Sequence, residues 1–307
     1  MKRLCFFLFI TYFYTSSFAQ KTKFTPTEAG KCDEDKWELV FEDNFDGNQI
    51  NQAVWQNKTY AQGTFANEGV EGYCTFDNIK VENGTCKIFA KTENVQRKAV
   101  SWQPDTLKMS DGLPNLRAYN RTVAWIETKK NYGYGKYEIR CKIPKEKGFW
   151  PAFWMYGEKN RVNNELDVFE FWNPSNIFGG YNAKKLSMID HMTIHYNGKM
   201  SGKSYEGPDF SQDFHTFTLI WDESKIEWYV DGELKRISTF YTAKRGGNVE
   251  CKDIKAGKTY YENPIFPKDS MNIIANLAVQ KGKDAPENTE FNSAYEIDYI
   301  RYYKKVK

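Results

Sequence analysis

The sequence predicts an all-β protein, a sandwich or jelly roll of two antiparallel sheets in one domain. Short segments in which apolar and polar residues alternate recur along the whole chain, and such alternation indicates half-buried strands. Turn residues separate these segments, and helical periodicity sustained over ten residues is almost absent. Many short strands with turns between them are typical of this fold class.

The predicted strands follow one another to the end of the chain. In order, they are KYEIRCKI (136–143), HMTIH (191–195), HTFTLIW (215–221), the hairpin KIEWYVDGELKR (225–236), MNIIANLAV (271–279) and EIDYIRYY (296–303). Asp231-Gly232 in the hairpin suits a two-residue turn. Asn272, Asn276 and Gln280 lie opposite the apolar residues of their strand, which indicates either a ligand-lined face or an ordinary solvated face.

The N-terminus predicts export. Residues 1–19 combine the basic pair Lys2 and Arg3, an apolar stretch and a Ser17-Phe18-Ala19 cleavage site, as in a secretory signal peptide. Residues 20–36 form a lead segment, and residues 37–307 form the single domain. We therefore expect a secreted or periplasmic protein without membrane insertion.

Composition narrows the function classes. The net charge of +3, with 27% charged residues, provides no strong field for nucleic acid or membrane. The 17% aromatic content fits a carbohydrate-binding protein as well as a large core. Among the cysteines, Cys74 and Cys86 could bridge neighbouring strands, and Cys141 is expected to be a buried thiol.

The segment NNELDVFEFWN (163–173) raises a problem of spacing. It places three carboxylates, Glu165, Asp167 and Glu170, in an apolar and aromatic run. Side chains of a regular strand alternate between its two faces. Glu165 and Asp167 would therefore share one face, while Glu170, five residues after Glu165, would point into the core, where an unpaired carboxylate is costly.

A β-bulge resolves this problem. One additional residue, Val168 or Phe169, restores the phase of the strand. Four side chains then share one face: Glu165, Asp167, Glu170 and Trp172. The sequence therefore predicts a bulge in this strand.

Three neighbouring carboxylates repel one another, so one must stay protonated while another is ionised. This arrangement suits glycoside hydrolysis, in which one carboxylate attacks the anomeric carbon and another protonates the leaving oxygen. No cofactor is needed for catalysis, because both roles belong to carboxylates. A solvated acidic strand and a calcium site are the alternatives, although calcium loops usually interleave Gly and Asn or Asp in a turn.

Longer blocks of the chain resemble glycoside hydrolase family 16. The run from Glu165 to Glu170 is similar to its bulged ExDxxE signature, found in laminarinases, agarases, porphyranases and κ-carrageenases. The other similar blocks are FEDNFDG (41–47), YGYGKYEIRCKIPKEKGFWPAFWMYG (132–157), FHTFTLIWDESKIEWYVDGE (214–233), NIIANLAV (272–279) and IDYIRYY (297–303). The resemblance covers about residues 37–303.

The resemblance implies a concanavalin A-like jelly roll with an open substrate cleft and a retaining, double-displacement mechanism. Glu165 matches the nucleophile, Asp167 the assisting acid and Glu170 the acid/base. The expected substrate-binding residues are Trp150, Trp154, Trp172, His195, Asn276, Gln280, Asn67 and Glu68. Many members hold a structural calcium ion (Ca2+), and the matching positions here are Asn44, Gly84 and Asp298.

We therefore expect a monomeric, endo-acting hydrolase that cleaves β-1,3- or β-1,4-linkages in a glucan or galactan polysaccharide, most similar to a laminarinase (endo-1,3-β-glucanase). The lead-in Asn160–Asn164 lacks the W-P-x-S-G-E that laminarinases usually carry. Agarase-, porphyranase- or carrageenase-like activity, a host-glycan endo-β-galactosidase, a transglycosylase and a non-catalytic lectin-like module therefore stay open.

Overall fold

The computed structural model describes residues 22–30, 36–57, 70–100, 103–109, 112–172, 183–280 and 289–306. The predicted signal peptide (1–19) and part of the lead segment (20–36) lie outside these residues.

In the described ranges almost every regular element is a strand. The strands are β1 (Lys23–Phe24), β2 (Lys36–Asp43), β3 (Trp55–Gln56), β4 (Val70–Glu71), β5 (Tyr73–Cys74), β6 (Ile79–Glu82), β7 (Thr85–Ile88), β8 (Lys91–Lys98), β9 (Leu116–Thr128), β10 (Gly135–Lys142), β11 (Phe149–Lys159), β12 (Val162–Glu170), β13 (Ile189–Tyr196), β14 (Lys199–Glu206), β15 (His215–Trp221), β16 (Lys225–Val230), β17 (Glu233–Thr239), β18 (Tyr241–Thr242), β19 (Tyr260–Glu262), β20 (Asn272–Gln280) and β21 (Tyr295–Val306). Short 3-10 turns complete the set: η1 (Phe76–Asn78), η3 (Ala183–Met188) and η4 (Cys251–Asp253). None of these helical pieces is long and apolar enough to cross a bilayer.

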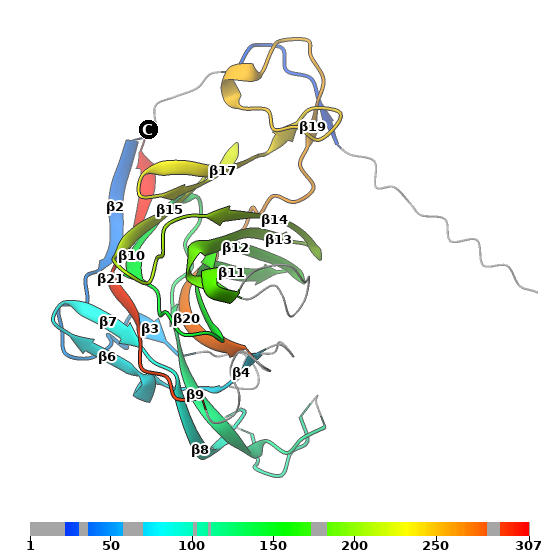
Figure 1. The fold of residues 1–307 in the computed structure, drawn as a ribbon. Helices are drawn as coiled ribbons and strands as arrows, with labels where there is room; N and C mark the ends of the chain where they lie inside the picture. The colour runs from blue at the N-terminus through cyan, green and yellow to red at the C-terminus, as the bar shows by residue number, and fades with distance from the viewer. Residues whose placement is uncertain are drawn as a thin grey trace, which may run out of the picture.

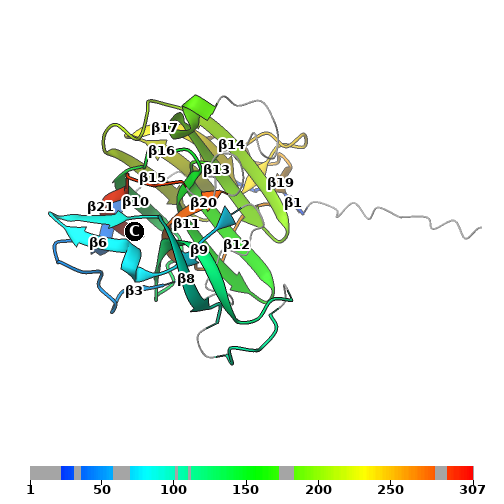
Figure 2. The same ribbon diagram turned by 60° about the horizontal axis from the view of Figure 1, so that its bottom comes forward.

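Two large sheets form the body of the protein. The ten-stranded sheet runs in the order β14-β13-β12-β11-β20-β9-β3, with β4, β5 and β8 attached at its side. The eight-stranded sheet runs β17-β16-β15-β10-β21-β7-β6, with β2 paired to β21. Figures 1 and 2 show these sheets as two layers, with the small β1-β19-β18 sheet at one end. The predicted all-β sandwich is therefore confirmed.

The core lies between the two layers. From the ten-stranded sheet, Phe153 and Phe169 are fully buried, and Phe169 packs on Phe217 of β15 with ring centroids 4.5 Å apart. Trp221 and Trp228 on the opposing sheet are also fully buried. Burial of these large rings is the main favourable contribution to folding, because it removes the most apolar surface from water.

The predicted hairpin turn is present. Val230 pairs with Glu233, and the two turn residues Asp231 and Gly232 have φ angles of 50° and 81°. Two successive positive φ angles define the type I′ turn, which matches the twist of the flanking strands.

Cys74 and Cys86 do not form the bridge that the sequence left possible. Both cysteines are buried thiols outside any disulfide, as is Cys141. Cys74 lies on β5, which pairs with β9, whereas Cys86 lies on β7 of the other sheet. Cys251 is disulfide-bonded, and its partner lies outside the described residues.

Candidate active site

Strand β12 contains the predicted bulge. Strand β11 places Phe153 opposite Phe169 and Trp154 opposite Asp167, so Val168 is the additional residue. Val168 and Phe169 are both buried. Because two consecutive side chains point into the core, Glu170 returns to the face of Glu165 and Asp167. We call this outward side of the ten-stranded sheet the carboxylate face.

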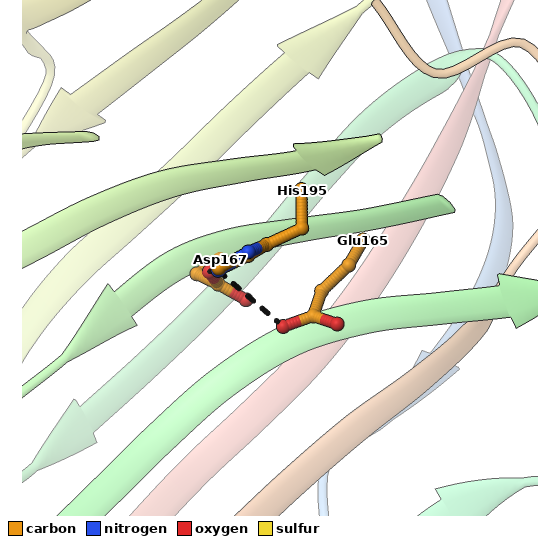
Figure 3. A group of neighbouring side chains, drawn as sticks. All are labelled: Glu165, Asp167 and His195. Carbon is orange, nitrogen blue, oxygen red and sulfur yellow. Dashed lines mark ion pairs between the residues drawn. The ribbon is translucent and has the colours of Figure 1, made fainter. Parts of the chain in front are cut away.

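Glu165, Asp167 and His195 converge on the carboxylate face (Figure 3). His195 on β13 lies opposite Glu165, and its Nε2 is 3.7 Å from Glu165 Oε1 and 3.5 Å from Asp167 Oδ2. The Glu165 side chain is 24% exposed, whereas that of Asp167 is only 2% exposed. A ligand molecule can therefore reach Glu165 directly, while Asp167 acts from beneath it.

The surroundings raise the pKa of all three acids. Burial raises the pKa of Glu165 to about 8; the charge of Asp167 adds to this rise, and His195 opposes it. Burial also raises the pKa of Asp167 to about 8. The pKa of Glu170 lies well above its ordinary value, because of burial and the charges of Asp167 and Glu165. Glu170 is therefore suited to donate a proton, and Glu165 and Asp167, with carboxylate oxygens within 4.8 Å of each other, can share a negative charge.

Two tryptophans surround Glu170. Trp150 Nε1–H donates a hydrogen bond to Glu170 Oε1 at 3.0 Å. The rings of Trp150 and Trp172 stack with centroids 5.3 Å apart, and Trp172 in turn contacts His191 at 4.9 Å. Both tryptophans are only partly buried, so their surfaces remain available to a sugar ring.

A second aromatic group flanks the carboxylates on the side of β20 and β9. Trp154 Nε1–H donates to Asn276 Oδ1 at 2.7 Å, and the Trp125 ring meets that of Trp154 edge-on at 5.2 Å. Trp125 donates to Glu127 Oε2 at 3.0 Å. Trp125 and Glu127 were not predicted from the sequence. They alternate with the core residue Ile126, but only the pairing of β9 with β20 places them beside Asn276.

The remaining predicted substrate residues are Gln280, Asn67 and Glu68, and none of them is among the contacts described above. Gln280 lies four residues beyond Asn276 on β20 and is 3% exposed. Asn67 and Glu68 lie outside the described residues. Segments 58–69, 173–182 and 281–288, which follow β3, β12 and β20 in the sequence, also lie outside them.

Two of the three positions suggested for calcium contact arginine side chains in this structure. Asp298 Oδ2 forms an ion pair with Arg140 Nη1 at 2.5 Å, and Asn44 Oδ1 accepts a hydrogen bond from Arg301 Nη2 at 3.1 Å. Gly84 occupies the tight turn between β6 and β7, with φ at 72°. Calcium prefers a shell of oxygen ligands, and one oxygen of each of these two side chains contacts an arginine here. Calcium binding stays a prediction.

Comparison with known proteins identifies the family. The sequence profile described as "Glycosyl hydrolases family 16" matches residues 94–301, more than half of the chain. The chain belongs to glycosyl hydrolase family 16. The profile includes β12 and both flanking strands, so this glycoside hydrolase carries its three carboxylates inside the matched region.

Individual relatives of this family 16 chain are distant. It is 26% identical to a beta-glucanase of Rhodothermus marinus, covering 88% of this chain and 86% of that protein. It is 27% identical to a kappa-carrageenase of Pseudoalteromonas carrageenovora, and the match covers 86% of this chain and 63% of that protein. It spans only 38% of the length of a 25% identical glucan endo-1,3-beta-glucosidase of Niallia circulans.

Solved structures share the fold. The catalytic domain of a laminarinase from Thermotoga petrophila is 27% identical, with a TM-score of 0.60 over 89% of this chain and all of that one. A structure described with endo-acting O-glycanases of the human gut microbiota has a TM-score of 0.65 at 23% identity. The match covers 88% of this chain and 91% of that one. At that identity the second likeness concerns the fold alone.

The raised pKa of Glu165 predicts a pH-dependent stability. Its ordinary value is 4.5, and its value in the folded protein is about 8. Between these values the folded state holds more protons than the unfolded state, so the free energy of unfolding falls as pH rises. Glu165→Gln removes this contribution. We expect the free energy of unfolding of the Glu165→Gln variant, minus that of the parent, to increase from pH 4.5 to pH 8 by on the order of 1–3 kcal/mol.

Thermal unfolding followed by circular dichroism at several pH values measures this difference. Glu223→Gln is the matched control, because Glu223 is exposed. The stability of this variant should depend on pH in the same way as that of the parent. A constant offset between Glu165→Gln and the parent across this range would contradict the prediction.

Proposed function

We propose that this protein is an endo-acting, retaining β-glycan hydrolase. The observation that carries the proposal is the Val168 bulge, which places Glu165, Asp167 and Glu170 on one face. Glu165 is partly accessible and is the nucleophile. Glu170, whose pKa burial raises well above its ordinary value, protonates the leaving oxygen and then activates water. Asp167 shares the charge of Glu165 and adjusts its basicity.

The flanking residues support this assignment of a sugar-binding face. Trp150 and Trp172 on one side and Trp154 with Asn276 on the other provide ring surfaces and an amide next to the acids. Such aromatic and polar pairs suit the apolar faces and hydroxyls of pyranose rings. Because rings lie on both sides of Glu165, the enzyme should bind a glycan chain across the carboxylates and cleave it internally.

A β-1,3-linked glucan is the first substrate to test, because several relatives carry glucanase names. Galactans are the second candidate class, because a kappa-carrageenase and a beta-agarase are similarly related. The Asn160–Asn164 lead-in, unlike that of usual laminarinases, is the reason to keep both. We also propose a monomer that is exported after cleavage of residues 1–19.

Digestion of separate polysaccharides with product sizing tests the proposal. The set should contain laminarin, mixed-linkage glucan, agarose, porphyran, κ-carrageenan and mucin O-glycans. We expect a series of short products from at least one, and proton NMR of the first product should show the β-anomer before mutarotation. Binding without cleavage of every glycan would instead indicate a lectin-like module. First products in the α-form would contradict retention.

A further inference from the structure

The cluster of carboxylates needs a positive charge near it. Glu165 and Asp167 share a negative charge at the working pH of the proposed hydrolysis, on which this inference rests. Among the described residues, the only cationic group within 4.0 Å of either is His195, which is charged only when protonated. A buried anion without a permanent counter-charge is costly. A permanent cation close by would therefore stabilise the nucleophile.

Arg236 enters the core from the opposite sheet. Trp228 and Tyr229 of β16 pair with Arg236 and Leu234 of β17, so Lys235 is the additional residue of a second bulge. This bulge gives Arg236 the inward orientation of Trp228, and Arg236 is only 6% exposed. A side chain as polar as arginine is rarely buried without a function or several partners.

Arg236 is held in place on the core side of the catalytic strand. It donates hydrogen bonds to the carbonyl of Met192 on β13 and, at 2.8 Å, to the carbonyl of Ser201 on β14. Its guanidinium lies over the Trp228 ring, 4.4 Å from the centroid. Trp228 in turn donates its Nε1–H to the Asp167 carbonyl at 2.8 Å. Arg236, Trp228 and the backbone of Asp167 thus form one connected group.

The charge of Arg236 acts on Asp167 through this interior. Arg236 lowers the pKa of Asp167 against the effect of burial, and Asp167 raises the pKa of Arg236, which burial lowers to about 10. Arginine therefore stays charged throughout the working range of a hydrolase. Between buried groups, water and salt screen this attraction only weakly.

The remaining charged groups around Asp167 do not replace this cation. Glu165 on β12 adds negative charge, burial keeps Glu170 protonated, and His195 on β13 is charged only when protonated. Asp190 on β13 is fully buried, and burial raises its pKa well above its ordinary value, so it stays neutral.

We propose that Arg236, held on Trp228 behind the catalytic strand, is a positioning residue that supplies the permanent positive charge for the Asp167–Glu165 pair. It touches no substrate, because it lies on the core side of the sheet. Its effect is to keep this pair ionised, and so to maintain an active nucleophile, at lower pH than burial alone would allow.

The test compares Arg236→Met, which removes the charge, with Arg236→Lys, which keeps it. Loss of the cation should move the acidic limb of the kcat/KM profile upward by on the order of one pH unit. Arg236→Lys should move it by less than half as much. Arg245→Met, at an exposed position, is the matched control and should leave the limb in place. If Arg236→Met does not fold, Arg236→Gln removes the charge and keeps a hydrogen-bonding side chain.

A second readout does not need activity. Without Arg236, Asp167 should hold its proton to higher pH, so the Tm difference between parent and Arg236→Met should widen from pH 7 to pH 9. A Tm loss that is constant with pH, together with an unmoved acidic limb, would show that Arg236 only packs the core and would overturn the inference. If the parent cleaves no glycan, the proposed function fails, while the Tm profile still tests the charge on Asp167.

Discussion

Glu165→Gln should lower kcat on the susceptible polysaccharide by about 10⁴-fold or more, the loss expected when a covalent nucleophile is removed. Glutamine has nearly the same shape but cannot form the glycosyl ester of the first step. Glu165 is paired by strand register with Tyr156 and His195, so the neutral side chain keeps the same position. The variant should therefore bind an oligosaccharide with a Kd within about threefold of the parent, equivalent to less than 1 kcal/mol.

Initial-rate kinetics and isothermal titration calorimetry measure the two parts of this prediction separately. Glu223→Gln, which neutralises an exposed acid far along the chain from β12, should retain full turnover. Near-parental activity of Glu165→Gln would remove Glu165 from the nucleophile role. A parallel loss of binding and turnover would show that the substitution disturbs the site as a whole.

Glu170→Gln should lower kcat/KM on the polysaccharide by about 10²–10⁴-fold, because no group then protonates the leaving sugar oxygen. The loss should be much smaller for the first step on an aryl glycoside with an acidic phenol, which leaves without protonation. The second step stays slow, since the amide side chain of this variant cannot activate water. A rapid burst of phenol followed by slow turnover is therefore expected.

Stopped-flow measurement of phenol release detects this burst, and addition of azide tests the second step. Azide attacks the glycosyl-enzyme without losing a proton, so it should restore turnover of Glu170→Gln but not of Glu165→Gln. The reverse pattern, with azide rescue of Glu165→Gln alone, would exchange the roles of the two glutamates. The two variants together therefore show which of the two glutamates is the acid/base and which is the nucleophile.

The bulge and the faces of the active strand could be predicted because they depend on local periodicity. The five-residue step from Glu165 to Glu170 required one additional residue, and Val168 is that residue. Trp154 and Phe153 are neighbours on β11 and so point to opposite sides, and Phe153 is the buried one. Both conclusions use only the alternation of side chains along a strand, which operates over a few residues.

Features that depend on pairing between distant segments were missed or wrong. Trp125 and Glu127 join the site because β9 pairs with β20, about 150 residues later in the chain. A bridge between Cys74 and Cys86 was one possibility from the sequence, yet their strands belong to different sheets. Nothing in the local sequence specifies which strands become neighbours, since many pairings satisfy the same alternation.

The sequence by itself determined the all-β class, the outward set of three carboxylates and the family, because period-two patterns and motif spacing are written in contiguous residues. The environment of those carboxylates is set only by the tertiary structure. Burial raises their pKa values, His195 approaches from β13, and Arg236 packs on Trp228 of the other sheet. These effects act through space and depend on desolvation and on the distance between charges, and both exist only once the two sheets have packed together.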